Sequence, residues 1–198
     1  VSFQAALAGH DVAIESADVG DFDACVALLA RITARHGPVD VLVNAAGITR
    51  DASFRKMAVE QWQQVLRVNL DSAFNLSKQV VDGMCERGFG RIVNISSIFG
   101  QTNYAASKAG LHGFTMALAR EVARKGVTVN SISPGYIETA MTAAMPDDVR
   151  QQVVAAIPVG RIGQPEDIAR AVDYLCSDAA SYLTGVNLPV NGGMFLSF

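Results

Sequence analysis

A tyrosine and a lysine four positions apart, Tyr104 and Lys108, are the first candidates for chemistry in this sequence. On a helix, this spacing places both side chains on one face. A phenol, with an ordinary pKa of about 10, transfers protons poorly at neutral pH unless a nearby cation favours the phenolate. Lys108 would supply that cation. The pair alone also fits an ordinary surface pair, so its meaning depends on what surrounds it.

Two further polar residues extend this pair. Ser97 follows a predicted strand at 91–95, and its hydroxyl could polarise a substrate carbonyl or hold an alcohol beside the phenol. Asn69 falls inside a predicted helix, where asparagine is locally unfavourable. We interpret Asn69 as holding a water that contacts Lys108, through its amide or through a distorted backbone carbonyl.

Short β-branched runs alternate with longer helical patterns along the chain. Strands are predicted at 39–43, 91–95, 127–132 and 186–190, with a weaker one at 11–14, and helices at 22–36, 61–87, 104–124 and 166–177. This alternation predicts an α/β fold, a doubly wound parallel sheet in one Rossmann-type domain over 1–198. The buried candidates in the long helix at 61–87 include Trp62, Val65, Leu66, Leu70, Phe74 and Val81.

Small residues follow three of the predicted strands. They are Asn44-Ala45-Ala46-Gly47, then Ser96-Ser97, then Ser133-Pro134-Gly135. Ligands of such sheets bind beyond the carboxyl ends of the strands, and small residues let the backbone approach a ligand closely. Each segment fits a tight turn, but the set of three is better explained by one shared ligand.

Composition excludes several functional classes. Of the 198 residues, 50% are hydrophobic, 18% are charged and the net charge is -3, which argues for a sizeable core and against nucleic-acid or electrostatic membrane binding. The longest apolar run is the seven residues 24–30, short of the roughly 18 that a membrane helix needs. Three widely separated cysteines, Cys25, Cys85 and Cys176, indicate free thiols and a cytoplasmic location. The spacing of the histidines does not match a metal site: His10, His36 and His112.

Five stretches in this order resemble the short-chain dehydrogenase/reductase family, and the resemblance covers essentially the whole chain. Within the family, the sequence is most similar to bacterial ketoreductases that act on 3-oxoacyl thioesters. The stretches are NAAGITRDASFRKM at 44–57, RIVNISS at 91–97, GQTNYAASKAGLHGF at 100–114, VTVNSISPGYIET at 127–139 and NGG at 191–193.

The resemblance implies a role for each catalytic candidate. Tyr104 would be the general acid that protonates a ketone oxygen, and Ser97 would hold that oxygen. Lys108 would lower the pKa of the tyrosine and hold the nicotinamide ribose. Asn69 would anchor the water relay that returns the proton.

A nicotinamide cofactor is also implied, NADPH rather than NADH. Asp18 and Val19 would lie beside the adenine, and the turn along the adenosine ribose would comprise Asn44, Ala45, Ala46 and Gly47. The nicotinamide end would be contacted by Pro134, Gly135, Ile137 and Thr139. The family more often has a second asparagine where Ala45 stands, which costs one side-chain hydrogen bond.

For the substrate, the resemblance implies an acyl thioester, first acetoacetyl-CoA reduced to 3-hydroxybutyryl-CoA, with an acyl-carrier-protein thioester as the alternative. Asp51, Gln101 and Tyr136 match positions of the thioester pocket, although each also fits a polar loop residue. Residues 139–158 would form a mobile lid. The apolar helices at 61–87 and 104–124 would pair between subunits of a homotetramer. Another alcohol dehydrogenase of the family, or an inactive nucleotide-binding module, remain as alternatives.

Two departures from the family pattern stand out. No glycine-rich phosphate turn precedes Val39, so the first βαβ unit is expected to be missing, and the sheet is expected to be split with two unpaired edges. Ser97 and Tyr104 are only seven positions apart. Part of a loop between Ile98 and Phe99 is therefore also expected to be missing.

Overall fold

The computed structural model describes residues 12–97, 100–143 and 145–196, and its centre is a four-stranded parallel sheet. The strands are β1 (Val41–Asn44), β2 (Gly90–Ile95), β3 (Val127–Pro134) and β4 (Asn187–Val190). Their order in the sheet is β1-β2-β3-β4, with every neighbouring pair parallel. The predicted α/β fold with a parallel sheet is confirmed. The expected gap between Ile98 and Phe99 lies outside the described residues.

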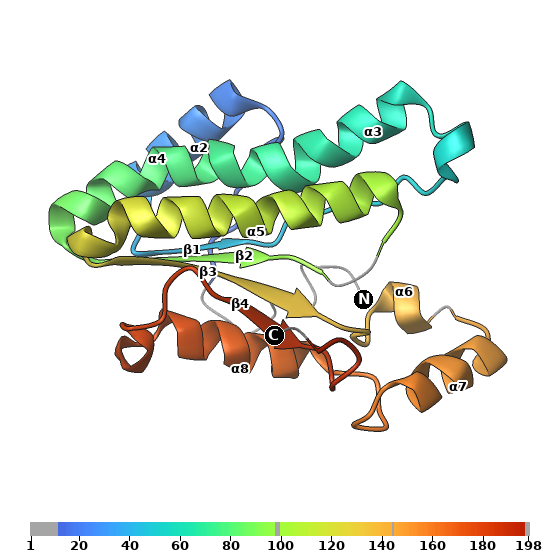
Figure 1. The fold of residues 1–198 in the computed structure, drawn as a ribbon. Helices are drawn as coiled ribbons and strands as arrows, with labels where there is room; N and C mark the ends of the chain where they lie inside the picture. Colours follow the sequence, from blue (N-terminus) through green and yellow to red (C-terminus); the bar gives the residue numbers. More distant parts are fainter. Residues whose placement is uncertain (1–11, 98–99, 144, 197–198) are drawn as a thin grey trace.

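Helices cover both faces of this sheet (Figure 1). One layer contains α2 (Phe22–His36), α3 (Val59–Leu66), α4 (Ser72–Arg87) and α5 (Thr102–Val122). The other contains α6 (Ala140–Ala143), α7 (Asp147–Ala156) and α8 (Pro165–Cys176). Four short helical turns complete the described elements: η1 (Phe54–Lys56), η2 (Arg67–Asp71), η3 (Ala123–Lys125) and η4 (Asp178–Ala180).

The central strands are buried on both sides, as expected for a parallel sheet between two helical layers. Ile92 and Val129 pack against α2, α4 and α5, in a cluster that includes Met84. Val93 and Ile132 face the opposite way and pack with Leu175 of α8. Successive residues of β2 therefore supply two separate cores.

Two sequence predictions about the sheet are wrong. Residues 12–14 form no strand, and Val12 and Ile14 are half exposed. An alternating apolar pattern produces a strand only where a neighbouring strand can accept its hydrogen bonds. Within the described residues, no strand pairs with this segment. The sheet is also continuous rather than split, because its four strands are neighbours in chain order. Its outer strand, β1, keeps Val41 and Val43 partly exposed.

The predicted helix at 61–87 is interrupted by the π-helical turn η2. Such insertions are rare and occur frequently at functional sites. Asn69 lies inside this turn and is buried. Val65 and Val81 are buried as predicted, but Phe74 is 52% exposed, so its predicted burial is wrong. On α4 the buried face carries Ala73, Ser77 and Val80, and position 74 points away from it.

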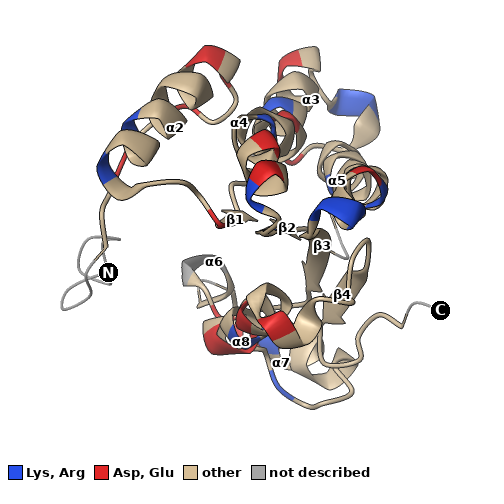
Figure 2. Ribbon diagram, turned by 90° about the vertical axis from the view of Figure 1, so that its left-hand side faces the viewer, with Lys and Arg blue, Asp and Glu red and all other residues tan. Residues whose placement is uncertain are grey.

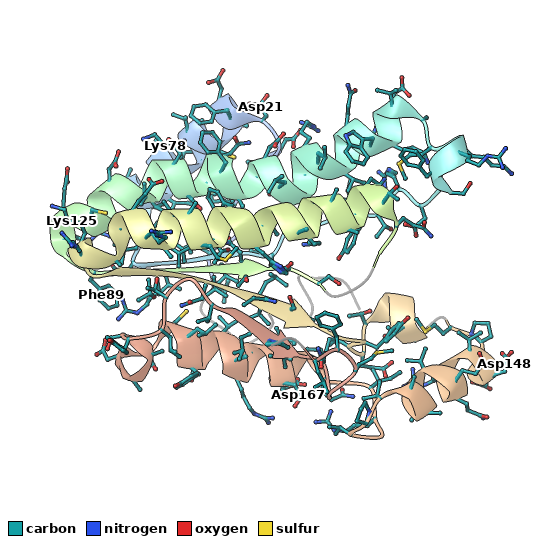
Figure 3. The ribbon with its side chains drawn as sticks, viewed as in Figure 1. Asp21, Lys78, Phe89, Lys125, Asp148 and Asp167 are labelled. Atoms are coloured by element: carbon teal, nitrogen blue, oxygen red, sulfur yellow. The ribbon has the colours of Figure 1, made fainter. Side chains whose placement is uncertain are left out.

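The carboxyl ends of the strands meet at one edge of the sheet, next to α6 and α7. Phe89 and Lys125 lie at the opposite, amino-terminal edge, far from Asp148 at the start of α7 (Figure 3). Among the helices of the described ranges, none combines the length and the hydrophobicity that a membrane crossing requires.

Two glycines on α5 allow the packing of this helix to be tested. A Cβ at Gly110 would lie 2.8 Å from Leu70 Cδ2 of η2, whereas a Cβ at Gly113 would meet nothing within 4 Å. We expect Gly110→Val to lower the free energy of unfolding by about 1–3 kcal/mol relative to Gly113→Val, because only the former overpacks this contact. Urea unfolding followed by Trp62 fluorescence would measure this difference, and equal values would contradict it.

Candidate active site

Ser97, Tyr104 and Lys108 come together at the carboxyl edge of the sheet. Ser97 follows β2, and Tyr104 and Lys108 lie one turn apart in the first half of α5. The Ser97 hydroxyl hydrogen-bonds to the side chain of Tyr104. Lys108 Nζ lies 5.6 Å from the centroid of the Tyr104 ring. Ser97 and Tyr104 are therefore in contact, although only seven positions separate them in the sequence.

The Lys108 ammonium is buried, with only 5% of the residue exposed. Its Nζ donates to the carbonyl oxygen of Ile95 at 2.7 Å, and the Ser96 hydroxyl donates to the Lys108 carbonyl at 3.0 Å. Burial penalises the charged form and lowers the pKa of Lys108 to about 8. The amine therefore remains mostly protonated at pH 7 as a partly desolvated cation beside the phenol.

The Tyr104 phenol has the opposite shift. Burial raises its pKa, the hydrogen bond from Ser97 lowers it, and the negative charge of Asp51 raises it again. The net direction is upward, so the hydroxyl keeps its proton at neutral pH. This state suits a group that donates a proton to a substrate oxygen.

Asn69 uses its side chain to fix the turn that follows β1. Its Oδ1 accepts from the Ile48 amide at 2.7 Å, and its Nδ2 donates to the Ile48 carbonyl at 3.0 Å and to Ser107 Oγ at 3.3 Å. The amide group is thus committed to protein partners, which leaves the backbone carbonyl of η2 as the group that could hold a water. A Cβ at Gly47 would lie 3.6 Å from Lys108 Nζ, in ordinary van der Waals contact, so Gly47 lies directly beside the ammonium.

The row of small residues after β1 borders this space. Ala45, Ala46 and Gly47 are exposed, whereas Asn44 is buried. Asn44 Nδ2 donates to Asn94 Oδ1 at 2.8 Å, but its Oδ1 has no hydrogen-bond partner among the described residues. A buried acceptor without a partner, next to an open backbone, fits a ligand that brings a hydroxyl or amino donor.

Asp18 is attached to the same helical insertion, η2, and Val19 to the helix α4 that follows it. The Asp18 carboxylate accepts from Arg67 Nη1 of η2 at 2.9 Å and from the Gly20 amide at 2.9 Å, and these two hydrogen bonds hold its pKa below the ordinary value. The Val19 carbonyl accepts from Asn75 Nδ2 at 3.0 Å. One π-helical turn therefore anchors both Asp18 and, through Asn69, the turn at Gly47.

The segment after β3 borders the site from the other layer. The Gly135 amide donates to the Val190 carbonyl at 3.1 Å, and a Cβ at Gly135 would lie 2.8 Å from Asn191 Cα, so the Pro134-Gly135 turn requires glycine. Ile137 forms a bridge to Gly163, and the Thr139 amide donates to Thr142 Oγ1 at 2.7 Å.

The three candidate substrate residues have different positions. Asp51 is exposed and acts electrostatically on Tyr104, and Gln101 is exposed just before α5. Tyr136 lines a cavity of about 300 Å³ together with Ile157 of the predicted lid. Within 139–158, Val153 and Ile157 are buried in a small cluster with Ile162. The predicted lid thus has its own apolar contacts, separate from the two main cores.

Two residues at the site were missed in the sequence. Arg67, the partner of Asp18, carries no local signal, because the two are 49 positions apart. Asn103 is fully buried, accepts from the Tyr104 amide at 2.8 Å and donates to the Arg50 carbonyl at 3.1 Å. Asn103 lies inside the first turn of α5, after the N-cap Gln101, and its partner Arg50 is 53 positions away, so no local signal identifies it.

The family model described as enoyl-(acyl carrier protein) reductase matches residues 2–195, nearly the whole chain. The chain belongs to the short-chain dehydrogenase/reductase family. This short-chain dehydrogenase/reductase is therefore an NAD(P)-dependent oxidoreductase, as the sequence predicts.

Named relatives are similar over most of the chain. An acetoacetyl-CoA reductase of Allochromatium vinosum is 57% identical, over 96% of this chain and 80% of the relative. An acetoacetyl-CoA reductase of Cupriavidus necator is 51% identical, over 95% of this chain and 79% of the relative. A 3-oxoacyl-[acyl-carrier-protein] reductase of Escherichia coli is 50% identical, over 85% of this chain and 72% of the relative.

The residues of this short-chain dehydrogenase/reductase fit a nicotinamide cofactor at the strand ends. The observations that carry this fit are the buried Asn44 acceptor without a described partner, the exposed residues Ala45 to Gly47, and the Lys108 ammonium next to Gly47, which together suit ribose hydroxyls. The sequence before Val39 contains no glycine-rich phosphate turn, so this fit concerns the ribose and nicotinamide contacts rather than the pyrophosphate.

Replacing Lys108 tests how much the burial of its ammonium group lowers the stability of the folded chain. Below about pH 8 both folded and unfolded chains carry the Lys108 charge, and burial destabilises only the folded chain. We expect Lys108→Met to increase the free energy of unfolding at pH 7 by about 1–3 kcal/mol. As the pH rises from about 8 to about 10.4, the folded chain loses this proton first, so the wild type should gain stability and the difference should shrink.

Urea unfolding across this pH range would measure the effect. Lys78, on the exposed side of α4, provides a matched control (Figure 3). Lys78→Met should change the free energy of unfolding by less than about 0.5 kcal/mol at any of these pH values. A Lys108→Met protein that is less stable than the wild type throughout would contradict the prediction.

Proposed function

We propose that this protein is an NADPH-dependent ketoreductase that converts a 3-oxoacyl thioester, acetoacetyl-CoA first, to the 3-hydroxyacyl thioester. The observation that carries the proposal is the grouping of Ser97, Tyr104 and a buried Lys108 at the sheet edge. Relatives named acetoacetyl-CoA reductase, at 57% and 51% identity, support acetoacetyl-CoA as the substrate.

The catalytic roles follow from the protonation states of the site. The bound cofactor supplies the hydride that reaches the carbonyl carbon. The Ser97 hydroxyl holds the ketone oxygen, and the Tyr104 hydroxyl, protonated at neutral pH, gives its proton to that oxygen. Lys108 then stabilises the phenolate that remains. The backbone carbonyl of Asn69, in the π-helical turn, holds the water that returns a proton to the site.

We assign the cofactor contacts to segments that border this site. Asp18 and Val19 hold the adenine end, Asn44 to Gly47 follow the adenosine ribose, and Lys108 holds the nicotinamide ribose. At the nicotinamide end the contacts are Pro134, Gly135, Ile137 and Thr139. The choice of NADPH over NADH rests on similarity to the ketoreductases.

We assign the thioester to the side of the site formed by Asp51, Gln101 and Tyr136, with residues 139–158 as the lid. An acyl-carrier-protein thioester is the second candidate, supported by the relative from Escherichia coli at 50% identity. The exposed cations Arg50, Arg55 and Lys56 suit either the phosphates of coenzyme A or an acidic carrier protein. We also propose a cytoplasmic location, supported by three unpaired cysteines.

Tyr104→Phe tests the catalytic assignment. With acetoacetyl-CoA as substrate, we expect NADPH oxidation to fall by at least about 100-fold, because the general acid that gives its proton to the ketone oxygen is lost. NADPH binding, measured by its fluorescence, should remain. Tyr174→Phe removes a similar hydroxyl from a half-exposed residue of α8 and should retain full activity. Equal activity of the Tyr104→Phe and wild-type proteins would favour the inactive nucleotide-binding module.

The same assay compares substrates and cofactors. We expect faster turnover of acetoacetyl-CoA than of an acyl-carrier-protein-linked 3-oxoacyl substrate, and faster turnover with NADPH than with NADH. A preference for the carrier protein would support the second candidate. Turnover of neither substrate, together with NADPH binding, would redirect the assignment to another alcohol of the family.

We propose a homotetramer that pairs the outer faces of α4 and α5. These helices leave Phe74 and Met116 about half exposed, at 52% and 53%, and a groove of about 360 Å³ between them is lined by Phe74, Phe114 and Cys85. Covering this apolar surface stabilises an assembly. Light scattering should give a mass near four times 21.0 kDa, and Phe74→Asp should lower it. A wild-type mass near one chain would contradict the proposal.

A further inference from the structure

His112 lies on α5, one turn after Lys108, and has no role in the proposed mechanism. Its Nε2 lies 3.3 Å from the hydroxyl of Ser133, which in turn donates to Asn187 Oδ1 at 2.8 Å. The hydroxyl of Ser131 lies 3.1 Å from the same Oδ1. Both serines are fully buried on β3, and Asn187 begins β4. A chain of hydrogen bonds therefore connects α5 to the two strands beneath it.

The hydrogen bonds around Ser133 favour one tautomer of the histidine. Ser133 has one hydroxyl proton, and it is directed to Asn187 at the shorter of its two distances. With Asn187 Oδ1 facing the serines, the Ser133 oxygen acts as an acceptor toward His112, which corresponds to the Nε2–H tautomer of the ring. In the neutral ring, Nδ1 is the unprotonated nitrogen.

Burial, reinforced by Lys108, keeps this ring neutral. Burial and then the charge of Lys108 lower the pKa of His112 below its ordinary value, so the ring is uncharged at pH 7. The strands packed beneath it, β3 and β4, carry no ionisable residue (Figure 2). The other ionisable side chains of α5 besides Tyr104, and those of α3 and η2, are charged and exposed: Arg120, Glu121, Glu60, Arg67 and Asp71.

We propose that His112 is a positioning residue for the nicotinamide end of the site. Ser133 directly precedes the Pro134-Gly135 turn, and Lys108 lies one turn before His112 on α5. A neutral His112 that donates to Ser133 fixes the turn relative to the ammonium. This inference rests on the proposed function, which places the nicotinamide between these two groups.

The proposal has a consequence at acid pH. Protonation of Nδ1 creates a second cation one turn from Lys108, with no acidic residue on β3 or β4 to offset it. Repulsion and poor solvation then favour movement of the half-buried ring toward water, which releases Ser133. The Kd for NADPH should therefore rise as the pH falls through the pKa of His112.

Nitrogen-15 NMR of the histidine ring tests the contact without any activity measurement. We expect the Nε2–H form at pH 7 and a pKa below the ordinary value of about 6.5. Lys108→Met should raise this pKa, and Ser133→Ala should weaken the preference for the Nε2–H form. An Nδ1–H ring, or a pKa that does not respond to Lys108→Met, would overturn the proposal.

Binding of NADPH tests the consequence. His112→Leu removes the donor and should weaken binding about three- to tenfold, the equivalent of one hydrogen bond. His112→Gln keeps an N–H donor of similar reach, and it should stay within about twofold of wild type and lose the acid-pH dependence. His36→Leu, on an exposed histidine at the end of α2, is the matched control and should bind normally.

Further variants separate positioning from folding. Ser133→Ala should weaken binding as much as His112→Leu, and the double variant should be no weaker than either single one. Wild-type affinity in His112→Leu, or equal losses in His112→Gln and His112→Leu, would overturn the positioning role. Failure of the wild type to bind NADPH would instead overturn the proposed function, and the NMR experiment would still decide the contact between His112 and Ser133.

Discussion

The burial of one ammonium group is the constraint on which the site depends. Among the described residues, Lys108 Nζ donates to the Ile95 carbonyl at the end of β2, and the pKa of about 8 reflects the cost of desolvating the ammonium. Such a cost is tolerated only where surrounding contacts hold the group in place. Here they come from the Ser96 hydroxyl, which donates to the Lys108 carbonyl, and from the packing of α5 on β3.

The π-helical turn η2 organises the opposite border of the site. A regular helix from 59 to 87 would rotate Asn69 relative to α4, whereas the inserted turn directs the asparagine to the Ile48 backbone and Arg67 to Asp18. Gly110 allows α5 to approach this turn closely at Leu70. The irregular backbone therefore links the segment after β1, the segment at 18–19 and the helix that carries Tyr104.

Three protonation states come together at the site. Burial keeps the Tyr104 phenol protonated, Lys108 remains mostly charged, and the charge of Lys108 helps to keep His112 neutral. A reductase that delivers a proton to a substrate oxygen requires the first state, and stabilisation of the resulting phenolate requires the second. Because His112 is neutral, α5 can place Lys108 and His112 one turn apart and still pack on β3 and β4, which carry no acidic residue.

The sequence by itself determined the parallel α/β fold and the pairing of Tyr104 with Lys108. Both follow from local rules: the helical spacing of four residues and the meeting of parallel strand ends at one edge. Only the tertiary structure decided that residues 12–14 form no strand, that Phe74 is exposed, that η2 interrupts its helix and that Arg67 binds Asp18. These features depend on which distant segments become neighbours, because burial and hydrogen-bond partners are set by packing rather than by local pattern.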